Sequence, residues 1–469
     1  MVRRFIRDIR FWIFLFFCIR LFHITAPPLE TGHNWRQTTV TMVARNFVEE
    51  DANIFFPRVD FAGERSGITG MEFPLLNYGI YLVSEVCGYD HWYGRLINLI
   101  ISSLGVYYFF LLVRRVFDRE VAFYATLVLL GSIWFSFSRK IMPDTFAVSL
   151  VIASLYYAHC YLYDSRHRTI HLLGFTLLAA LGMLSKLPAG FLFILLAIPL
   201  CDKRVPIQER ILVGSASVGA LLPVLWWYFF WVPFLVSEYG FWHFFMGNSL
   251  SMGWQELQGH GMEVASRFYD DALKFTGFAV FLFGIVRIIR SKQRLALLIL
   301  ILSALSFAII VIKGGRTFYH HNYYVIPFVP VMALICGHAL ASVGKNWLRI
   351  ALVSIIMLEG VINQQHDFRI KEHMQALEGL EEDLDLLTDK DDLILINSGD
   401  YPTPMYFAHR KGWVMDNERI ARDQTLDSLK AKGLTAVVVL KRTFGSPIDI
   451  ERSASFDSED YTIYLLSAD

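Results

Sequence analysis

The sequence has no excess of charge of either sign. Its 469 residues include 43 Lys and Arg and 43 Asp and Glu, which gives a formal net charge of +0. Because the sequence has no basic domain or basic stripe that could contact a phosphate backbone, nucleic acid is not expected as a partner. Only 5 cysteines are present, mostly inside apolar segments without close pair spacing, so neither a disulfide framework nor a zinc site is predicted. The last ~107 residues contain no GxGxxG or Walker pattern, which leaves nucleotide binding there without support.

Hydrophobic residues are abundant instead. They make up 55% of the chain, aromatic residues make up 15%, and the mean hydropathy is +0.42. This composition predicts an α-helical polytopic membrane protein. The first apolar run resembles a signal sequence, but no small-residue cleavage site precedes Pro27, so it is expected to remain as the first span. About 11 crossings are predicted, some of them short, near residues 11–26, 95–113, 120–138, 143–163, 170–184, 187–201, 209–232, 272–289, 294–312, 322–343 and 347–362.

Basic loops predict the orientation of these spans. Residues 71–93 are not counted as a span, because polar residues interrupt them in an amphipathic, helix-like pattern that indicates a juxtamembrane helix. With the N-terminus in the cytoplasm, the positive-inside rule is then satisfied along the chain. The basic residues on the cytoplasmic side are Arg3, Arg4, Arg7, Arg10, Arg114, Arg115, Arg166, Arg168, Lys203, Arg204, the run from Arg287 to Arg294, and Lys345.

Nearly all unusual polar residues then share the outer face. Such a one-sided set suggests a reaction or a recognition event there, whereas a channel or carrier should place polar groups through the bilayer midplane. Few polar residues lie at that depth, and Asn98 is an example that is more typical of a helix–helix hydrogen bond. The outer segments are residues 27–93, 139–144, Lys186, 233–271, 313–321 and the C-terminal region.

The chain changes character after residue 362, where charged and turn-forming residues become frequent. This change predicts a membrane domain at 1–362 and a small soluble α/β domain at 363–469 on the outer face. The acidic run at 381–392 is expected to be a solvated linker or a helix end. Buried strands are expected at 392–397, 435–440 and 461–466, with an amphipathic helix at 418–432.

The densest group of functional side chains follows the first apolar run. Glu30, His33, Trp35, Arg36 and Gln37 bring a carboxylate, an imidazole, an indole, a guanidinium and an amide into one short segment at the bilayer edge. Together they could hold a polar ligand and move a proton beside hydrocarbon. The alternative is an interfacial anchor, with the indole at headgroup depth and the guanidinium on lipid phosphate. For the carboxylate alone, the alternative is a charge that complements a helix N-terminus.

Several motifs occur in an order that resembles a known family. They are PLETGHNWRQ followed by MVARNF, then EFPLLNYGIYLVSEVCGYDHWYGRLINLI, RKIMPDTFA, SKLPAG, HHNYYVIPFVPVMALICG and FAHRKGW. Their order and their placement on one membrane face resemble the lipid-phosphate-sugar-dependent glycosyltransferases of the GT-C superfamily, in particular the family 39 protein mannosyltransferase and aminoarabinose transferase group. The family pattern commonly has an adjacent acidic pair in the first loop, whereas Glu30 stands alone here. Where many members read Lys-Pro-Pro-Leu, this chain has Glu72-Phe73-Pro74-Leu75.

The resemblance implies a GT-C-like fold and an inverting transfer of a monosaccharide from a polyprenyl phosphate to an acceptor at the outer face of a bacterial plasma membrane. Such a transfer needs a base for the acceptor hydroxyl and cations for the departing phosphate. Glu30 is the candidate base and Asp60 is the reserve. His33 and Arg36 could orient Glu30 or bind the acceptor sugar, and Trp35 could stack on a sugar face. Packing of the juxtamembrane helices is the alternative for these three residues.

Basic groups on the outer face near headgroup depth are the candidate phosphate ligands, and snorkelling anchors are the alternative for them. They are Arg139, Lys140, Lys186, Arg316, His320 and His321. Lys186 gives the strongest indication, because it lies in a tight turn between short apolar runs with little polarity around it. The adjacent His320 and His321 should point apart on a helix or strand, so no metal site is assigned. Together with His33, Trp35 and Arg36, the candidate substrate-binding residues are Gln37, Glu72, Arg139, Lys140, Asp144, Lys186, Arg316, His320, His321 and Tyr323.

Two other functions stay open. A flippase for lipid-linked glycans would also carry many spans, and it predicts polar groups along a crossing path. A non-catalytic membrane receptor would be built around the C-terminal domain, and it predicts that Glu30 is dispensable. For the transferase, the expected partners are a polyprenyl-phosphate sugar, membrane lipids and an envelope acceptor that is a lipid, a glycan or a protein. No cofactor is expected, since the lipid-linked donor is a substrate; dependence on a divalent metal stays open.

Overall fold

The computed structural model describes residues 6–164, 166–241, 247–422 and 424–466. Arg3 and Arg4 of the basic N-terminus, and residues 242–246 of the predicted outer loop, lie outside this description. The chain divides into two compact units. The first unit consists of Met1–Ile24, Arg95–Phe229 and Phe245–His366, and the second of Thr25–Gly94, Phe230–Phe244 and Asp367–Asp469.

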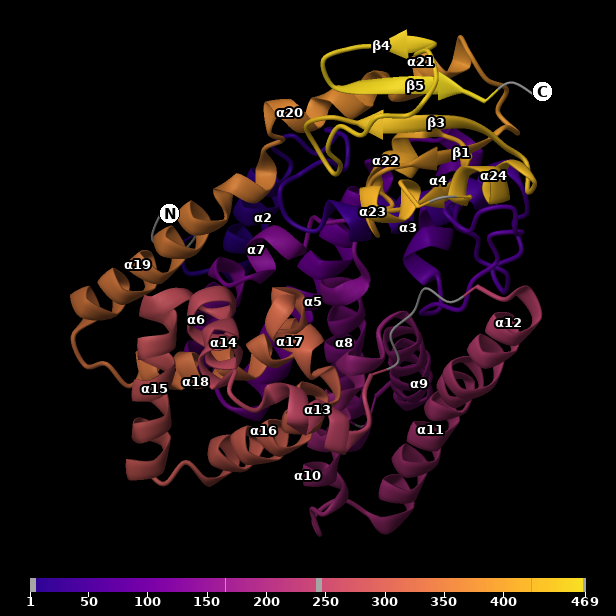
Figure 1. Ribbon diagram of the computed structural model, residues 1–469. Coiled ribbons are helices and arrows are strands. Elements are labelled where there is room, and N and C mark those ends of the chain that lie inside the picture. Colours follow the sequence, from indigo (N-terminus) through magenta and orange to yellow (C-terminus); the bar gives the residue numbers. More distant parts are fainter. Residues whose placement is uncertain (1–5, 165, 242–246, 423, 467–469) are drawn as a thin grey trace. The chain divides into compact units, whose positions relative to one another are not determined.

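Helices build the first unit (Figure 1). Their starts are marked in the sequence. Asp118 caps α6 by accepting hydrogen bonds from the backbone N–H groups of Glu120 and Val121 at 2.8 and 2.9 Å, and Pro143 occupies the first turn of α8. The helices are α2 (Ile9–Arg20), α5 (Tyr93–Val116), α6 (Arg119–Gly131), α7 (Trp134–Phe137), α8 (Pro143–Tyr163), α9 (Arg168–Ser185), η1 (Leu187–Leu196), α10 (Ala197–Leu200), α11 (Ile207–Trp226), η2 (Trp227–Trp231, which runs across the unit boundary), α13 (Leu250–Leu257), α14 (Gly261–Ser266), η3 (Arg267–Ala272), α15 (Lys274–Arg290), α16 (Arg294–Gly314), α17 (Arg316–His320), η4 (Asn322–Phe328), α18 (Val329–Ala341), α19 (Asn346–Gln364) and η5 (Gln365–Phe368).

Seven helices within the described residues are long and apolar enough to cross a membrane, or eight if the pair Gly261–Ala272 and Lys274–Arg290, bent by 102°, forms one span. The prediction of a multi-pass helical membrane protein is confirmed. About 11 crossings were expected because the apolar runs near 11–26, 120–138 and 187–201 were counted, and these form helices shorter than 18 residues. The seven are Tyr93–Val116, Pro143–Tyr163, Arg168–Ser185, Ile207–Tyr239, Arg294–Gly314, Asn322–Ala341 and Asn346–Phe368.

Glycines allow close approach between some helices of the first unit. A Cβ atom added to Gly360 of α19 would lie 1.7 Å from the carbonyl oxygen of Gly131 in α6. One added to Gly105 of α5 would lie 2.2 Å from Oγ of Ser149 in α8. Neither position has room for a larger side chain, which is how small residues let helices pack tightly within a membrane.

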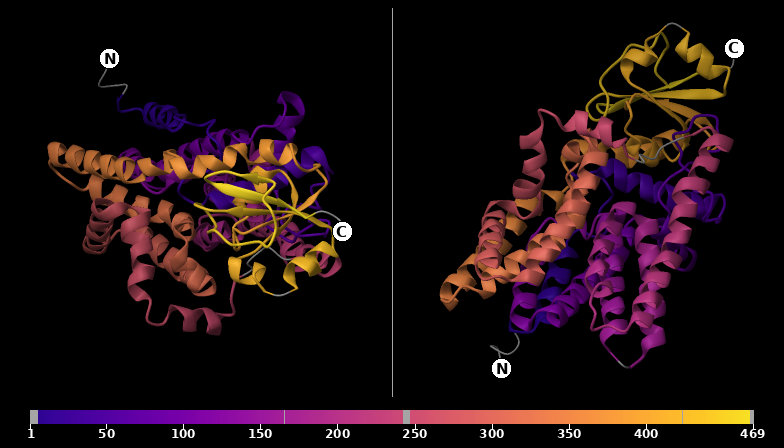
Figure 2. Two further views of the ribbon diagram at one scale, coloured as in Figure 1. Left: turned by 45° about the horizontal axis from the view of Figure 1, so that its top comes forward. Right: turned by 90° about the horizontal axis from the view of Figure 1, so that it is seen from below.

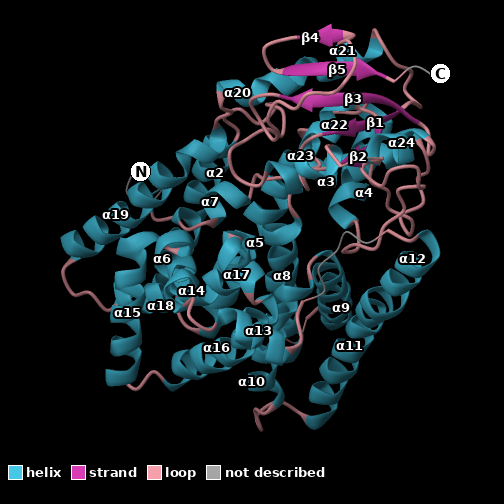
Figure 3. Ribbon diagram, in the orientation of Figure 1, coloured by secondary structure: helices cyan, strands magenta, loops and turns pink. Residues whose placement is uncertain are grey.

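The second unit contains every strand of the described residues (magenta in Figure 3). The strand order is β2-β1-β3-β5-β4; β1 pairs in parallel with β2 and β3, whereas β5 pairs in antiparallel fashion with β3 and β4. Figure 2 shows the same strands from two further sides. The predicted strands at 392–397, 435–440 and 461–466 are confirmed. The elements are α3 (Asn34–Glu49), α4 (Leu75–Cys87), α12 (Val232–Tyr239), α20 (Glu372–Gln375), η6 (Ala376–Gly379), α21 (Leu380–Asp385), β1 (Leu393–Ile396), α22 (Thr403–Ala408), β2 (Lys411–Val414), α23 (Asn417–Ile420), α24 (Thr425–Lys430), β3 (Leu434–Leu440), β4 (Phe456–Asp457) and β5 (Tyr461–Leu465).

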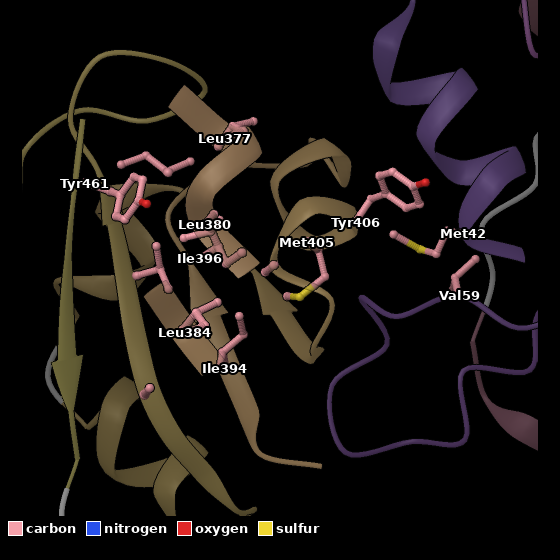
Figure 4. Close-up of a cluster of buried hydrophobic side chains, with 14 of the residues drawn as sticks. Met42, Val59, Leu377, Leu380, Leu384, Ile394, Ile396, Met405, Tyr406 and Tyr461 are labelled. Carbon is pink, nitrogen blue, oxygen red and sulfur yellow. The ribbon is translucent and has the colours of Figure 1, made fainter. Parts of the chain in front are cut away.

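One hydrophobic core joins the sheet to the loop that follows the first apolar run (Figure 4). Side chains alternate between the two faces of a strand. Ile394 and Ile396 of β1 therefore pack into the same core as Met42 of α3 and Val59, and all four are at most 2% exposed. Leu395, between them, faces the other side and packs in a second cluster with residues of α23 and α24. The C-terminal residues thus share a core with residues 25–94.

One prediction about this unit needs correction. The single helix expected at 418–432 is two short helices, α23 and α24, because Gln424 between them has φ of +69°, which a right-handed helix does not accommodate. For the acidic run at 381–392, the structure agrees with the helix end: α21 covers the first part of the run, and Lys390 contacts Glu381 and Asp385 at 2.6 and 2.8 Å. The predicted juxtamembrane helix within 71–93 is confirmed as α4.

Candidate active site

Glu30 lies in the second unit, just before α3. Its side chain is buried, and Oε2 accepts a hydrogen bond from Nε2 of Gln37 at 3.1 Å. Its backbone forms an antiparallel bridge with Ile370. His33, in the left-handed conformation with φ of +59°, begins α3 and turns the chain so that its carbonyl oxygen accepts hydrogen bonds from the N–H groups of Arg36 and Gln37. Gln37 of the same segment therefore orients the carboxylate, and the C-terminal part of the chain holds the backbone of Glu30.

Arg36 forms a buried salt bridge with Glu72, which precedes α4. Its guanidinium also lies 5.6 Å from the centre of the Trp35 ring. The side chains of the salt bridge are 9% and 4% exposed, so lipid phosphate does not reach them as it would reach an interfacial anchor. Arg36 thus has Glu72 as an ion-pair partner, and the amide of Gln37 donates to Glu30.

Asp60 is held as a structural acceptor. Its Oδ2 accepts from Nη2 of Arg45 at 2.8 Å and its Oδ1 accepts from Nδ2 of Asn46 at 2.7 Å. Its carbonyl oxygen accepts from the N–H of Gly412 at 2.9 Å, and Arg45 donates a further hydrogen bond to the carbonyl oxygen of Tyr406 at 3.0 Å. Donors therefore occupy both carboxylate oxygens of Asp60, as expected for a structural ion pair. The MVARNF motif supplies both partners, a role that its position in the sequence did not reveal.

The FAHRKGW motif fastens the C-terminal stretch to α3. Nε2 of His409 contacts Glu49 of α3 at 2.9 Å, and its Nδ1 contacts Glu381 of α21 at 2.6 Å. Burial lowers the pKa of His409, but the hydrogen bonds to Glu381 and Glu49 outweigh burial and raise the pKa above 6.5. The hydrogen bond from His409, aided by Lys390, holds the pKa of Glu381 at about 2. These opposite shifts describe a charged bridge, and no local pattern in the sequence pointed to it.

A second group of candidate residues meets within the first unit. Nζ of Lys186, between α9 and η1, lies 3.7 Å from Oδ1 of Asp144 in the first turn of α8. The same ammonium lies 5.5 Å from the centre of the Tyr323 ring, and His321 stacks on that ring at 5.4 Å. At 3.7 Å, Asp144 holds the ammonium by charge rather than by a direct hydrogen bond. Residues from the RKIMPDTFA, SKLPAG and HHNYYV motifs, far apart in the sequence, are thereby brought together.

Asn98 of α5 supports the turn that carries Arg139 and Lys140. Its Nδ2 donates to three backbone carbonyl oxygens between residues 137 and 142, at 2.8 to 3.2 Å, which confirms a structural hydrogen-bonding role for this intramembrane amide. Nη2 of Arg139 donates to the carbonyl oxygen of His23 at 2.9 Å, and Nζ of Lys140 lies 4.9 Å from the Phe137 ring. Both cations are 1% exposed, which differs from the exposed position of a snorkelling anchor.

Arg316 and His320 form an exposed pair in α17, with Nε of Arg316 donating to Nε2 of His320 at 3.0 Å. The backbone N–H of Arg316 donates to Glu256 at 2.7 Å. His320 and His321 therefore lie in different surroundings, as expected for adjacent residues. Over the described ranges of the chain, no group of three or more His, Cys, Asp or Glu side chains could hold a metal ion.

Comparison with known proteins agrees with the motif pattern. A family model described as dolichyl-phosphate-mannose-protein mannosyltransferase matches residues 72–229, whereas a search of curated proteins gives no match.

ArnT from Cupriavidus metallidurans in the apo state matches with a TM-score of 0.58 and 13% identity over 97% of each chain, and another structure of that protein is bound to undecaprenyl phosphate. The Archaeoglobus fulgidus oligosaccharyltransferase matches with a TM-score of 0.56 and 12% identity, over 92% of this chain and 70% of that one. Arabinofuranosyltransferase AftD from Mycobacteria matches with a TM-score of 0.55 and 12% identity, over 98% of this chain and 40% of that one. The resemblance predicted from the sequence motifs is thus confirmed: this chain has the fold of the GT-C membrane glycosyltransferases.

Proposed function

We propose that this protein transfers a monosaccharide from a polyprenyl phosphate to an acceptor of the cell envelope, with inversion at the anomeric carbon. The observation that carries the proposal is the assembly of the first-unit motifs around Lys186, since an ammonium held by Asp144 and an aromatic ring is suited to a phosphate. The fold similarity to a transferase whose structure contains undecaprenyl phosphate supports a lipid-linked donor of this kind.

In the proposed reaction, an oxygen of the acceptor forms a bond to C1 of the sugar while the bond from C1 to the phosphate oxygen breaks. The electron pair of the broken bond leaves with the polyprenyl phosphate, and the acceptor proton passes to the carboxylate of Glu30. Glu30 is proposed for this role because Gln37 donates a hydrogen bond that orients its buried carboxylate, whereas Arg45 and Asn46 hold both carboxylate oxygens of Asp60. Lys186 stabilises the charge that develops on the departing phosphate.

The remaining candidates have supporting roles in this proposal. Arg36 and Glu72 fix α3 against the segment before α4, and Trp35 offers an aromatic face for a sugar. Arg316 and His320 present an exposed basic pair that suits an anionic part of the donor or acceptor. We further propose that the protein resides in a bacterial plasma membrane with Lys186 and the C-terminal residues on the outer side, as the distribution of basic loops predicts.

The test is a transfer assay with purified protein and a panel of synthetic polyprenyl-phosphate sugars offered to lipid, glycan and protein acceptors. Transfer of the sugar, with release of polyprenyl phosphate in equal amount, is expected for at least one combination. Movement of the intact donor between leaflets without a new glycosidic bond would support the flippase instead. Binding without either outcome would support the receptor.

A further inference from the structure

A large apolar cavity lies inside the first unit, away from the residues discussed above. Its volume is about 650 Å³, and its walls come from α5, α8, η1, α10, α16 and α18. Apolar residues such as Ile152, Leu192 and Val331 form most of the walls. Apolar walls of this extent suit an apolar ligand, because burial of apolar surface against them is favourable.

The cavity has a polar end. Arg115, at the end of α5, is paired with Asp164 at 2.9 Å, and Arg204, after α10, is paired with Asp202 at 2.8 Å. Tyr163, the last residue of α8, also lines this end, and its hydroxyl lies 3.4 Å from Asp202. Arg115, Asp202 and Arg204 therefore line this end of the cavity, and Asp164 is next to it as the partner of Arg115.

The dimensions correspond to one leaflet of a membrane. Along α8 the lining runs from Ile152 to Tyr163, which is about 16 Å at the rise of an α-helix. This is close to half of the roughly 30 Å hydrocarbon core of a bilayer. Asp144 lies at the other end of α8, about 28 Å away along the helix. The polar end of the cavity is therefore separate from the cluster around Lys186.

We propose that this cavity binds one zwitterionic phospholipid of the leaflet next to the basic loops, with an acyl chain inserted among the helices. Its phosphate pairs with the guanidinium groups of Arg115 and Arg204, and the primary ammonium of a phosphoethanolamine headgroup donates hydrogen bonds to Asp164 and Asp202. Charge complementarity selects this headgroup, because an anionic lipid without an ammonium would leave the two carboxylates uncompensated. This site is independent of the transfer chemistry.

The decisive experiment uses the wild-type protein in lipid nanodiscs that contain a phosphatidylethanolamine with a diazirine at the end of one acyl chain. After photolysis, mass spectrometry of peptides should locate the label on cavity residues such as Ile152 and Val331, near one lipid per protein. Unlabelled phosphatidylethanolamine should compete several-fold better than phosphatidylglycerol. Label confined to the outward surfaces of the helices, or displaced equally by both lipids, would overturn the proposal. So would displacement by polyprenyl phosphate alone.

Two matched variants give an independent readout. Leu155→Trp fills the cavity with a larger side chain, whereas Leu298→Trp places the same residue on an exposed position of α16 that does not line it. Phosphatidylethanolamine retained through purification should fall several-fold in the first variant and stay unchanged in the second. Equal retention in both proteins would contradict the proposed site, and size-exclusion profiles show whether each has folded. Asp202→Asn should reduce the preference for phosphatidylethanolamine over phosphatidylglycerol without removing the bound chain, because it removes a carboxylate that accepts from the ammonium.

Discussion

Replacing Asp60 with Asn should destabilise the second unit strongly, because it removes the charge that compensates a buried guanidinium. The side chains of Arg45 and Asp60 are 5% and 4% exposed, so solvent cannot take over the role of the lost carboxylate. Removing one partner of such a buried pair costs about 3–5 kcal/mol. For a cooperative unit of this size, each kcal/mol corresponds to roughly 2–4 °C in Tm, which gives a decrease of about 6–20 °C.

Thermal unfolding in detergent, followed by circular dichroism, measures this effect. The matched control is Arg442→Met, since Arg442 and its partner Glu459 are 51% and 79% exposed and such pairs contribute only about 0–1 kcal/mol. A double variant, Arg45→Met with Asp60→Leu, should recover part of the lost stability, because it leaves no uncompensated charge behind. An Asp60→Asn protein with wild-type Tm and no transfer activity would refute the structural role and return Asp60 to the position of base.

Three other perturbations should separate chemistry from structure. Glu30→Gln keeps an oxygen that accepts the hydrogen bond from Gln37 but removes the group that takes up the proton. The transfer rate should therefore fall roughly 10²–10⁴-fold, while donor affinity and Tm stay unchanged. A wild-type transfer rate would show that Glu30 is not the base. Lys186→Met should weaken donor binding by about 1.5–3 kcal/mol in a titration with polyprenyl phosphate, whereas equal affinity would remove the phosphate contact. The stability contributed by His409, whose pKa is raised, is complete below pH 6.5 and is lost as pH rises through its folded pKa. The stability contributed by Glu381, whose pKa is lowered to about 2, is complete above pH 4.5 and is lost as pH falls towards 2. The wild-type Tm should therefore be highest between about pH 4.5 and 6.5. In the His409→Gln variant, the decrease in Tm above pH 6.5 should disappear. The same decrease in the variant would show that His409 does not cause it.

The periodic and apolar parts of this fold could be predicted from the sequence. Each of the apolar runs forms a helix, and the buried strand at 435–440 is found as β3, because a long apolar run or an alternating pattern carries its own structural signal. The number of complete spans could not be predicted as reliably, since the run at 120–138 is broken after α6 by Ser132, whose extended backbone ends the helix. The division of a run between helix and turn depends on tertiary contacts that apolarity does not encode.

The candidate site shows the same limit. Residues close together in the sequence, such as Glu30 and Gln37, were expected to act together and are hydrogen-bonded. Pairings between distant segments were out of reach: nothing local indicates that Arg36 pairs with Glu72, or that His409 bridges two carboxylates from separate helices. The motifs indicate which segments contribute to the candidate site, but the residue pairs between distant segments can be identified only from the fold.

The C-terminal residues have a closer relation to the first loop than a separate soluble domain would have. Ile370 bridges the backbone of Glu30, and the hydroxyl of Thr403 donates to Asn34 at 3.1 Å. Both contacts hold the segment that carries the candidate base. Removing residues 363–469 should therefore disturb the position of Glu30 itself, so we expect transfer to be lost even when the membrane helices remain folded.

The central claim, that this protein forms a glycosidic bond from a lipid-linked donor, is tested most directly by one measurement. Purified wild-type protein and the Glu30→Gln variant are incubated with a radiolabelled polyprenyl-phosphate sugar and an envelope extract that supplies acceptors, and label in the acceptor fraction is quantified together with released polyprenyl phosphate. The account predicts equal amounts of labelled product and released lipid for the wild type, and at least roughly 10²-fold less of both for the variant. Equal rates in the two proteins, or donor moved across the bilayer without a new bond to any acceptor, would contradict it.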